Sequence, residues 1–154
     1  MEGARRATDA DLPDLARLAG EATVEYTALK GGDMWRRRES RVPPFEPSFR
    51  SQIEAGDALV VAGTIDDVVV GYAAATIEVL RDGSRLGRVS ELFVEAPARG
   101  VAVGEVMMDL VLAWCREQGC TGVDALVLPG HRDAKNFFER FGLTARAIVV
   151  HRTL

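Results

Sequence analysis

The sequence predicts an α/β protein with a mixed central sheet flanked by helices on both faces. Short runs rich in Val, Ile and Ala alternate with segments whose apolar residues recur at helical spacing. Two hairpin turns join consecutive strands, so part of the sheet is antiparallel. A later strand–helix–strand segment, Arg88 to Leu128, predicts a right-handed crossover between two parallel strands.

The 154 residues fit a single domain, 1–154, and 47% hydrophobic with 27% charged residues is typical of a globular protein in water. The net charge of −4 argues against nonspecific nucleic-acid binding. No apolar run is long enough for a membrane span, and the N-terminus lacks the apolar centre of a signal peptide. Cys115 and Cys120 have no partners at zinc spacing. We therefore expect a reduced, cytoplasmic protein that needs no metal.

The first 57 residues predict a strand, a helix, an irregular segment and a second helix. The strand is Gly3–Ala7, and either Asp9 or Asp11 can cap the helix that follows. The segment 30–48 is rich in Gly, Pro and Arg, which predicts an irregular excursion. Its arginine run, Arg36 to Arg38, is either a solvated face or a site for an acidic partner. The short helix after it is stopped by Gly56.

The middle of the chain predicts three strands joined by tight turns. Residues 58–80 form a hairpin with Asp66 and Asp67 at its turn. An Asp-Gly turn follows, and the next strand runs over 88–96 until Pro97 ends it.

The remaining residues predict helix, strand, helix and strand. The helix Gly104–Gln118 is apolar around most of its circumference, so it packs on a sheet. Residues 122–129 form a nearly continuous apolar run, which favours a central strand buried on both faces. Residues 131–143 form a short helix closed by Gly142, and 144–154 form a final strand.

The junction before the long helix has the composition of an anion-binding loop. The first amides of a helix lack intrahelical acceptors and carry the positive end of the helix dipole. Gly100, Ala102 and Gly104 are small enough to let a phosphate approach those amides, and Arg99 adds a charge. A tight turn without a ligand remains the alternative interpretation.

Two segments resemble motifs of the GNAT N-acetyltransferase superfamily. Arg99-Gly100-Val101-Ala102-Val103-Gly104, entered from Leu92-Phe93-Val94, is similar to motif A. "HRDAKNFFERFGL" is similar to motif B, matching at Ala134, Phe137, Glu139 and Gly142. The resemblance implies the acyl-CoA N-acyltransferase fold, with six to seven strands in the sheet.

The resemblance also implies acetyl-CoA, or a close acyl-CoA, bound between the fourth and fifth strands. Backbone amides of the loop hold its pyrophosphate, at Gly100, Val101, Ala102, Val103, Gly104 and Glu105. Phe93 and Val94 pair with the pantetheine arm, and their amides polarise the thioester carbonyl and stabilise the oxyanion of the tetrahedral intermediate.

Three positions depart from the family pattern. Ala102 stands at a usual glycine, where its methyl group is tolerable unless a positive φ is needed. His131 stands at the Asn that contacts CoA; it either binds CoA or caps the helix. Phe138 replaces the Tyr that protonates the departing thiolate in many relatives, so another group does this work, the thiolate leaves unaided, or the chemistry is slow or absent. Tyr26 precedes the irregular segment expected to line the acceptor site, so it is a better replacement than Tyr72, which lies on a predicted central strand.

Glu91 is the candidate base for the acceptor amine. Strand alternation places Val89, Glu91 and Phe93 on one face and Leu92 and Val94 on the core face. A solvated charge on a half-exposed strand is the alternative interpretation. Glu78 is a weaker second candidate, and His151 is a strand-face residue.

We therefore expect an N-acetyltransferase that moves an acetyl group directly from acetyl-CoA to a primary amine of a small molecule or peptide. The alternative is a degenerate, non-catalytic acyl-CoA-binding protein with a regulatory role, which the changes at Ala102 and Phe138 favour. We expect no membrane or nucleic-acid partner. Since an apolar edge strand near the C-terminus is a liability, we also expect a homodimer that covers it.

Overall fold

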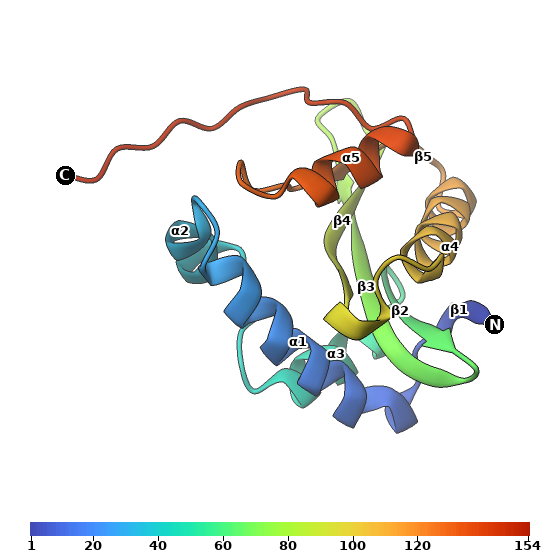
Figure 1. The fold of residues 1–154 in the computed structure, drawn as a ribbon. Helices are drawn as coiled ribbons and strands as arrows, with labels where there is room; N and C mark the ends of the chain where they lie inside the picture. Colours follow the sequence, from blue (N-terminus) through green and yellow to red (C-terminus); the bar gives the residue numbers. More distant parts are fainter.

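A single mixed sheet organises the molecule, and the computed structural model describes residues 1–154. The strands are β1 (Glu2–Arg6), β2 (Ala58–Ile65), β3 (Val68–Val79), β4 (Arg85–Val94) and β5 (Cys120–Ala125), and the helices are α1 (Leu12–Thr27), α2 (Gly32–Arg38), α3 (Phe45–Glu54), α4 (Val103–Glu117) and α5 (Arg132–Arg140). The strands lie in chain order across the sheet (Figure 1). Neighbours are antiparallel from β1 to β4, whereas β4 and β5 are parallel. The predicted mixed sheet is confirmed.

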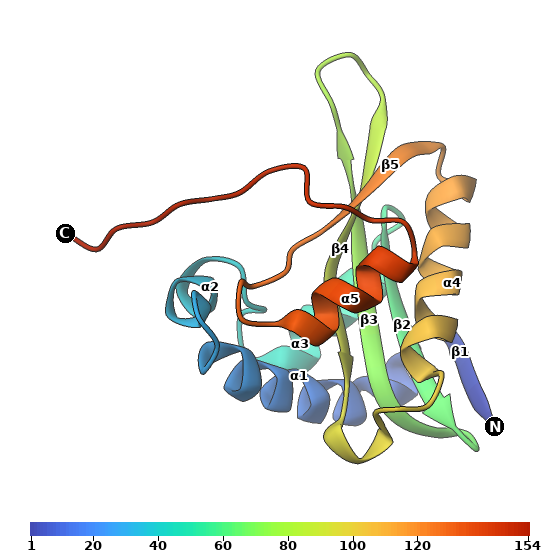
Figure 2. The same ribbon diagram turned by 45° about the horizontal axis from the view of Figure 1, so that its top comes forward.

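Helices cover both faces of the sheet, as predicted, and α1 and α4 lie on opposite sides of it in Figure 2. On one face, leucines of α1 pack with Phe49 of α3 and with Tyr72 and Phe93 of the sheet. On the other face, α4 contributes a larger apolar cluster that Phe138 of α5 joins. The sheet therefore separates two cores. None of the helices is both long and apolar enough to cross a bilayer.

Both predicted hairpins form. Asp66 and Asp67 have φ values of 48° and 67°, the left-handed conformation that a two-residue hairpin turn requires. The β3–β4 turn closes where the Leu80 amide donates to the Ser84 carbonyl at 2.8 Å. These turns fix the antiparallel half of the sheet.

The turn before α1 uses Asp11 rather than Asp9. The Asp11 carboxylate accepts the Thr8 amide at 2.8 Å and two Arg5 nitrogens at 2.7 and 2.8 Å. The Arg5 guanidinium holds the pKa of this carboxyl below its usual range. The start of the helix is thereby tied to β1.

The predicted irregular segment 30–48 is wrong in part, because it contains helix α2. Gly31 precedes this helix, Gly32 is its first residue and the prolines follow it, so nothing inside 33–39 interrupts helical hydrogen bonding. Gly31 supplies a left-handed φ of 82° before the helix. A Cβ on Gly32 would lie 2.1 Å from the Tyr26 carbonyl oxygen, so only glycine fits against the end of α1. The arginine run is exposed on α2, as expected for a solvated face.

Two predictions for the end of the sheet are wrong. It has five strands rather than six to seven, because residues 144–154 are extended but pair with no strand. β5 consequently lies at the edge of the sheet instead of at its centre. Its apolar residues still pack against the α4 core on one face, which explains the apolar run.

Candidate functional site

The parallel strands β4 and β5 separate partway along their length. They pair from Arg85 with Cys120 to Val89 with Ala125. Beyond that point, β4 continues to Val94 and pairs only with β3. We call the side of β4 that has no strand partner beyond Val89 the opening, and the loop that leads into α4 follows immediately.

A bulge at Ser90 sets the faces of β4 beside this opening. Glu91 pairs with Ala74 and Val89 with Ala75, so Ser90 is the extra residue. Val89 packs in the α4 core, whereas Phe93 packs with α1 and α3. The predicted common face of Val89, Glu91 and Phe93 is therefore wrong for Val89, since simple alternation does not hold across a bulge. The predicted core position of Leu92 and Val94 is confirmed.

The loop before α4 presents unpaired backbone amides. None of the amides from Gly100 to Glu105 donates to a backbone carbonyl. Gly100 has a φ of 90°, which favours glycine. Ala102 has a φ of −79°, so its methyl group causes no backbone strain. A Cβ on Gly104 would lie 3.2 Å from the Phe137 ring, so α5 packs closely against the first turn of α4.

The loop is suited to an anion with several oxygens. Unpaired amides at a helix N-terminus bind phosphate because they combine hydrogen-bond donors with the helix dipole. The Glu105 side chain turns aside to Arg140, at 3.1 Å. The residues present therefore fit the pyrophosphate of a coenzyme A.

Arg99 contacts β4 and α1. Its Nε donates to the Val94 carbonyl at 2.7 Å, and its guanidinium pairs with Glu25 at 2.8 Å. It also lies 5.3 Å from the centre of the Phe93 ring. Its charge is thus partly neutralised within the protein, which favours a role in holding the loop against β4.

At the end of β4, the backbone N–H and C=O groups of successive residues point alternately toward β3 and toward the opening. The Glu95 amide donates to the Val70 carbonyl at 2.9 Å, toward β3. The carbonyls of Leu92 and Val94 instead accept bonds from Tyr26 and Arg99 on the open side. Because this direction alternates along a strand, the Val94 amide faces the opening and the Phe93 amide faces β3. Of the two amides expected to meet a thioester, only that of Val94 is directed toward it.

The Glu91 carboxylate belongs to a nearly buried polar cluster. It accepts Arg41 Nη2 at 2.5 Å, Arg41 Nε at 3.0 Å and the Tyr72 hydroxyl at 2.7 Å. Arg41 is 7% exposed, donates also to Ser48 and Gln52, and lies 3.7 Å above the Phe49 ring. Glu91 is thus neither a solvated charge nor an isolated one. The alternative interpretation of an exposed carboxylate is wrong.

Tyr26 lies at the centre of an aromatic group on the same side of β4. Its ring is 5.3 Å from Trp35, 6.1 Å from Phe93 and 5.2 Å from His131. Its hydroxyl donates to the Leu92 carbonyl at 3.1 Å. Burial raises the pKa of the phenol, so it keeps its proton at neutral pH. Tyr26 therefore lies beside the last residues of β4 with its hydroxyl protonated.

The two positions from motif B lie differently. His131 is at the N-cap of α5, but its side chain makes no capping hydrogen bond. Burial lowers its pKa, which favours a neutral imidazole beside Tyr26. Phe138 is buried in the α4 core. Its ring therefore supports α5 against α4 and has no proton to give.

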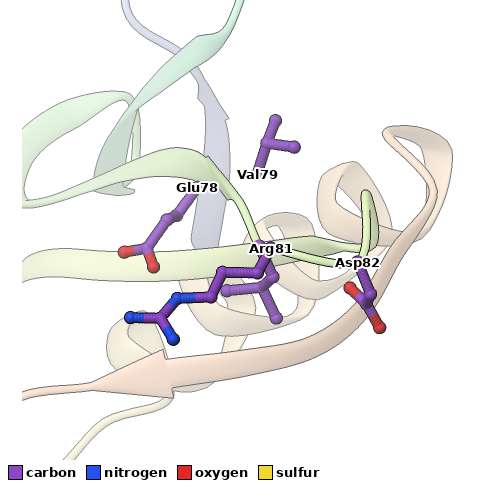
Figure 3. Close-up of a pocket in the computed structure, with 5 residues that line it drawn as sticks. Glu78, Val79, Arg81 and Asp82 are labelled. Carbon is purple, nitrogen blue, oxygen red and sulfur yellow. The ribbon is translucent and has the colours of Figure 1, made fainter.

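The other candidates lie away from the opening. Glu78 is exposed on the β3–β4 hairpin, 3.7 Å from Arg88. A hollow of about 480 Å³ at this hairpin is lined only by residues 78–82, and Figure 3 shows Glu78 with Val79, Arg81 and Asp82 there. His151 lies in the exposed segment after α5. The structure brings together no group of three His, Cys, Asp or Glu side chains able to hold a metal ion.

Arg41 is the member of the Glu91 cluster that sequence reasoning missed. It is one of several arginines in a segment without periodicity, and nothing in the sequence distinguishes it from its exposed neighbours. Its partners, Glu91 and Gln52, come from other elements. Only the packing of α3 against β2 and β3 brings these partners together.

Comparisons with known proteins bear on the family and the fold. The model of the acetyltransferase (GNAT) family matches residues 25–143. No curated protein sequence matches the chain.

Several solved structures share the fold. The BH1408 protein from Bacillus halodurans, as a tetramutant, superposes with a TM-score of 0.83 at 17% identity, covering 98% of this chain and 99% of that one. Glucosamine-6-phosphate N-acetyltransferase from Arabidopsis thaliana gives 0.72 at 19% identity, covering 99% and 98%. An aminoglycoside acetyltransferase from an uncultured soil metagenomic sample, in complex with sisomicin, gives 0.73 at 18% identity, covering 99% and 95%.

Proposed function

The chain belongs to the GNAT acetyltransferase family, and we propose that it transfers an acetyl group from acetyl-CoA directly to a primary amine. The observation that carries the proposal is the set of unpaired amides from Gly100 to Glu105 beside the opening between β4 and β5. When bound, acetyl-CoA supplies an activated acetyl group. The protein supplies the binding, the orientation and the movement of protons.

The loop amides hold the pyrophosphate, and the pantetheine arm follows the free edge of β4. The Val94 amide donates to the thioester oxygen, where negative charge develops during transfer. Phe93 and His131 line the α1 side of this arm. Phe138 acts indirectly, by keeping α5 against the first turn of α4.

Glu91 accepts the proton of the acceptor amine, directly or through a water molecule. Arg41 and Tyr72 donate hydrogen bonds to the two carboxylate oxygens of Glu91 and so fix the orientation of the carboxylate. An amine must therefore approach through the lone pairs that these donors leave free. Tyr26 gives its proton to the departing thiolate in place of the phenol that Phe138 lacks.

The acceptor is a small-molecule or peptide amine, bound between α2 and the free end of β4. Trp35 and the exposed arginines of α2 border this region. The structural neighbours suggest amino sugars and aminoglycosides as first probes. We further propose that the enzyme acts as a cytoplasmic homodimer and without a metal ion.

The test has two stages. Calorimetry with acetyl-CoA measures binding, and a thiol-release assay then measures turnover with glucosamine 6-phosphate, sisomicin and peptides bearing free amines. Release with any amine supports the enzyme. Binding without release across the panel supports the non-catalytic acyl-CoA-binding protein instead, which the phenyl ring of Phe138 favours. Absence of binding refutes both.

Tyr26→Phe separates the proposed acid from the scaffold. The variant should keep its affinity for acetyl-CoA and lose about 100-fold in kcat, the usual contribution of a positioned acid. Glu78→Gln is the control, because Glu78 is exposed on the β3–β4 hairpin away from the opening and its loss should leave kcat unchanged. An unchanged kcat for Tyr26→Phe would remove this residue from the mechanism.

A further inference from the structure

The acidic residues on the α1–α2 side of the opening are already neutralised. Each carboxylate within residues 25–41, and the Glu91 carboxylate on β4, has an arginine partner. The pairs are Glu25 with Arg99, Asp33 with Arg37, Glu39 with Arg38 and Glu91 with Arg41. A carboxylate paired in this way exerts little net attraction on a further cation, because the charge of its partner opposes it. These residues therefore offer little to attract a cationic acceptor.

Two cations of the same segment have no such partner. Lys30 and Arg36 are exposed, and neither forms an ion pair, whereas the neighbouring arginines of α2 do. The whole chain is acidic, with a net charge of −4. This side of the opening is consequently positive in a negative molecule, which favours an anion.

Arg36 lies close to the place where acyl transfer is proposed. It follows Trp35, whose ring is 5.3 Å from the Tyr26 ring. The Tyr26 hydroxyl donates to the carbonyl of Leu92, the residue after Glu91, at 3.1 Å. These contacts link α2 to the free side of β4. An acceptor bound between α2 and β4 therefore borders Arg36 as well as Glu91.

Lys30 lies where two loops meet beside the opening. A Cβ on Gly130 would lie 3.6 Å from the Lys30 amide nitrogen. A Cβ on Gly31 would lie 3.7 Å from side-chain atoms of Leu128 and Pro129. The loop before α2 thus touches the chain between β5 and α5, and both ribbon views show α2 beside this chain (Figures 1 and 2). Lys30 adds its positive charge at this junction.

The three arginines of α2 are not equivalent. Successive helical residues point about 100° apart, so Arg37 points almost opposite to Trp35. Arg37 and Arg38 each pair with a carboxylate of the same segment. Arg36 is the arginine of this helix whose guanidinium is free to bind a further oxyanion.

We propose that the acceptor carries an anionic group, a phosphate or a carboxylate, besides its primary amine, and that Arg36 binds this group. The inference rests on the proposed acetyl transfer, and it names the class of amine that the enzyme acetylates. An arginine fork matches the oxygens of both anions with two parallel hydrogen bonds. Lys30 adds to the attraction, and the pairing of Glu91 with Arg41 weakens its repulsion of the anion.

Two matched pairs of ligands test the preference for an anion. Calorimetry with coenzyme A present compares glucosamine 6-phosphate with glucosamine, and the dipeptide amide Ala-Glu with Ala-Gln. The anionic member should bind about tenfold more tightly, which is the effect of one hydrogen bond between charged groups. The difference should shrink as salt is added. A preference in the sugar pair alone identifies phosphate, and one in the peptide pair alone identifies carboxylate.

Substitution of Arg36 tests where the anion binds. Arg36→Gln should abolish the preference and leave the affinity for the neutral ligands unchanged. Arg37→Gln is the matched control, because it removes the same charge from a different side of α2 and should keep the preference. Both side chains are exposed, so both variants should unfold thermally as the native protein does. Equal effects of the two substitutions would overturn the assignment to Arg36. Equal or tighter binding of the neutral ligands, or no binding of the anionic ones, would overturn the anionic acceptor.

A thiol-release assay with the same ligands separates this inference from acetyl transfer itself. Release with glucosamine, without a preference for its phosphate, supports the transferase and overturns the anionic acceptor. A preference that Arg36→Gln abolishes, without release from any ligand, supports the anion site and refutes transfer to these amines.

Discussion

Substitution of Ala102 by aspartate should weaken acetyl-CoA binding without destabilising the fold. Ala102 is exposed at the N-cap of α4, among the amides assigned to the pyrophosphate. A carboxylate there interacts favourably with the helix dipole, which should raise the unfolding free energy by about 0.3–1 kcal/mol. The same carboxylate lies next to the pyrophosphate and repels it.

The repulsion sets the size of the effect. Two unit charges about 5 Å apart repel by roughly 3 kcal/mol at an effective dielectric constant of about 20. The dissociation constant for acetyl-CoA should therefore rise about 100-fold. Calorimetry measures the affinity and thermal unfolding measures the stability. The affinity for acetyl-CoA should fall while the unfolding free energy rises, whereas a misfolded variant would lose both.

Two controls isolate the position of the charge. Ala102→Asn keeps the size and removes the charge, so it should bind nearly as the native protein does. Ala113→Asp adds the same charge on an exposed position of α4, about 16 Å further along the helix. That separation exceeds the screening length of about 8 Å at physiological salt. Equal affinity of Ala102→Asp and Ala113→Asp would refute the placement of the pyrophosphate.

Three further predictions concern stability. Arg41→Lys should lose about 3 kcal/mol of unfolding free energy in urea, because a lysine cannot make the buried fork of hydrogen bonds. Gly63→Ala should lose about 1–3 kcal/mol, since its Cβ would lie 2.8 Å from a valine methyl group of α4, whereas Gly56→Ala, with nothing within 4 Å, should not. Above about pH 10, unfolded phenols ionise while buried Tyr26 and Tyr72, whose pKa values are raised, keep their protons. Unfolding free energy should then fall with rising pH by roughly 1.4 kcal/mol per unit for each phenol.

Controls and contradicting outcomes can be stated for these stability predictions. Arg37→Lys alters an exposed pair with Asp33 and should cost little. A similar small loss for Arg41→Lys would show that its cluster is solvated. Burial also raises the pKa of the Cys115 thiol to about 11, so urea unfolding at pH 9–11 should give Tyr26→Phe about two thirds of the native pH slope. An unchanged slope would show that its phenol ionises freely in the folded state.

Most of the fold could be predicted from the sequence, because most of its turns and helix ends are determined by neighbouring residues. The Asp66–Asp67 turn, the crossover into α4 and the glycine after α5 each depend on residues close in sequence. Helix α2 was missed because the composition of residues 30–48 was considered as a whole. The glycines and prolines of this segment lie on either side of residues 33–39 and not among them. The edge position of β5 was missed because an apolar run shows burial but not the number of neighbours.

The candidate site divides in the same way. The position of the loop from Gly100 to Glu105 at the start of α4, with its unpaired amides, was predicted, since a strand, small residues and a helix are adjacent in the chain. The partners of Glu91 were not, because Arg41 and Tyr72 reach it from other elements. The direction of the Phe93 amide was missed as well, since it depends on hydrogen-bond alternation with β3.

The extra residue at Ser90 makes β4 tolerant of one particular length change during evolution. Removing that residue would join Val89 directly to Glu91 and restore simple alternation, with Val89 still facing α4 and Phe93 still facing α1 and α3. Straightening the strand with Ser90 kept would instead turn Glu91 toward α4, so that the carboxylate would enter an apolar layer and the phenol and guanidinium that now hold it would lose their acceptor. The strand can therefore lose this one residue without changing its faces, whereas a register shift that keeps Ser90 would move Glu91 from the polar cluster into a core face in a single step.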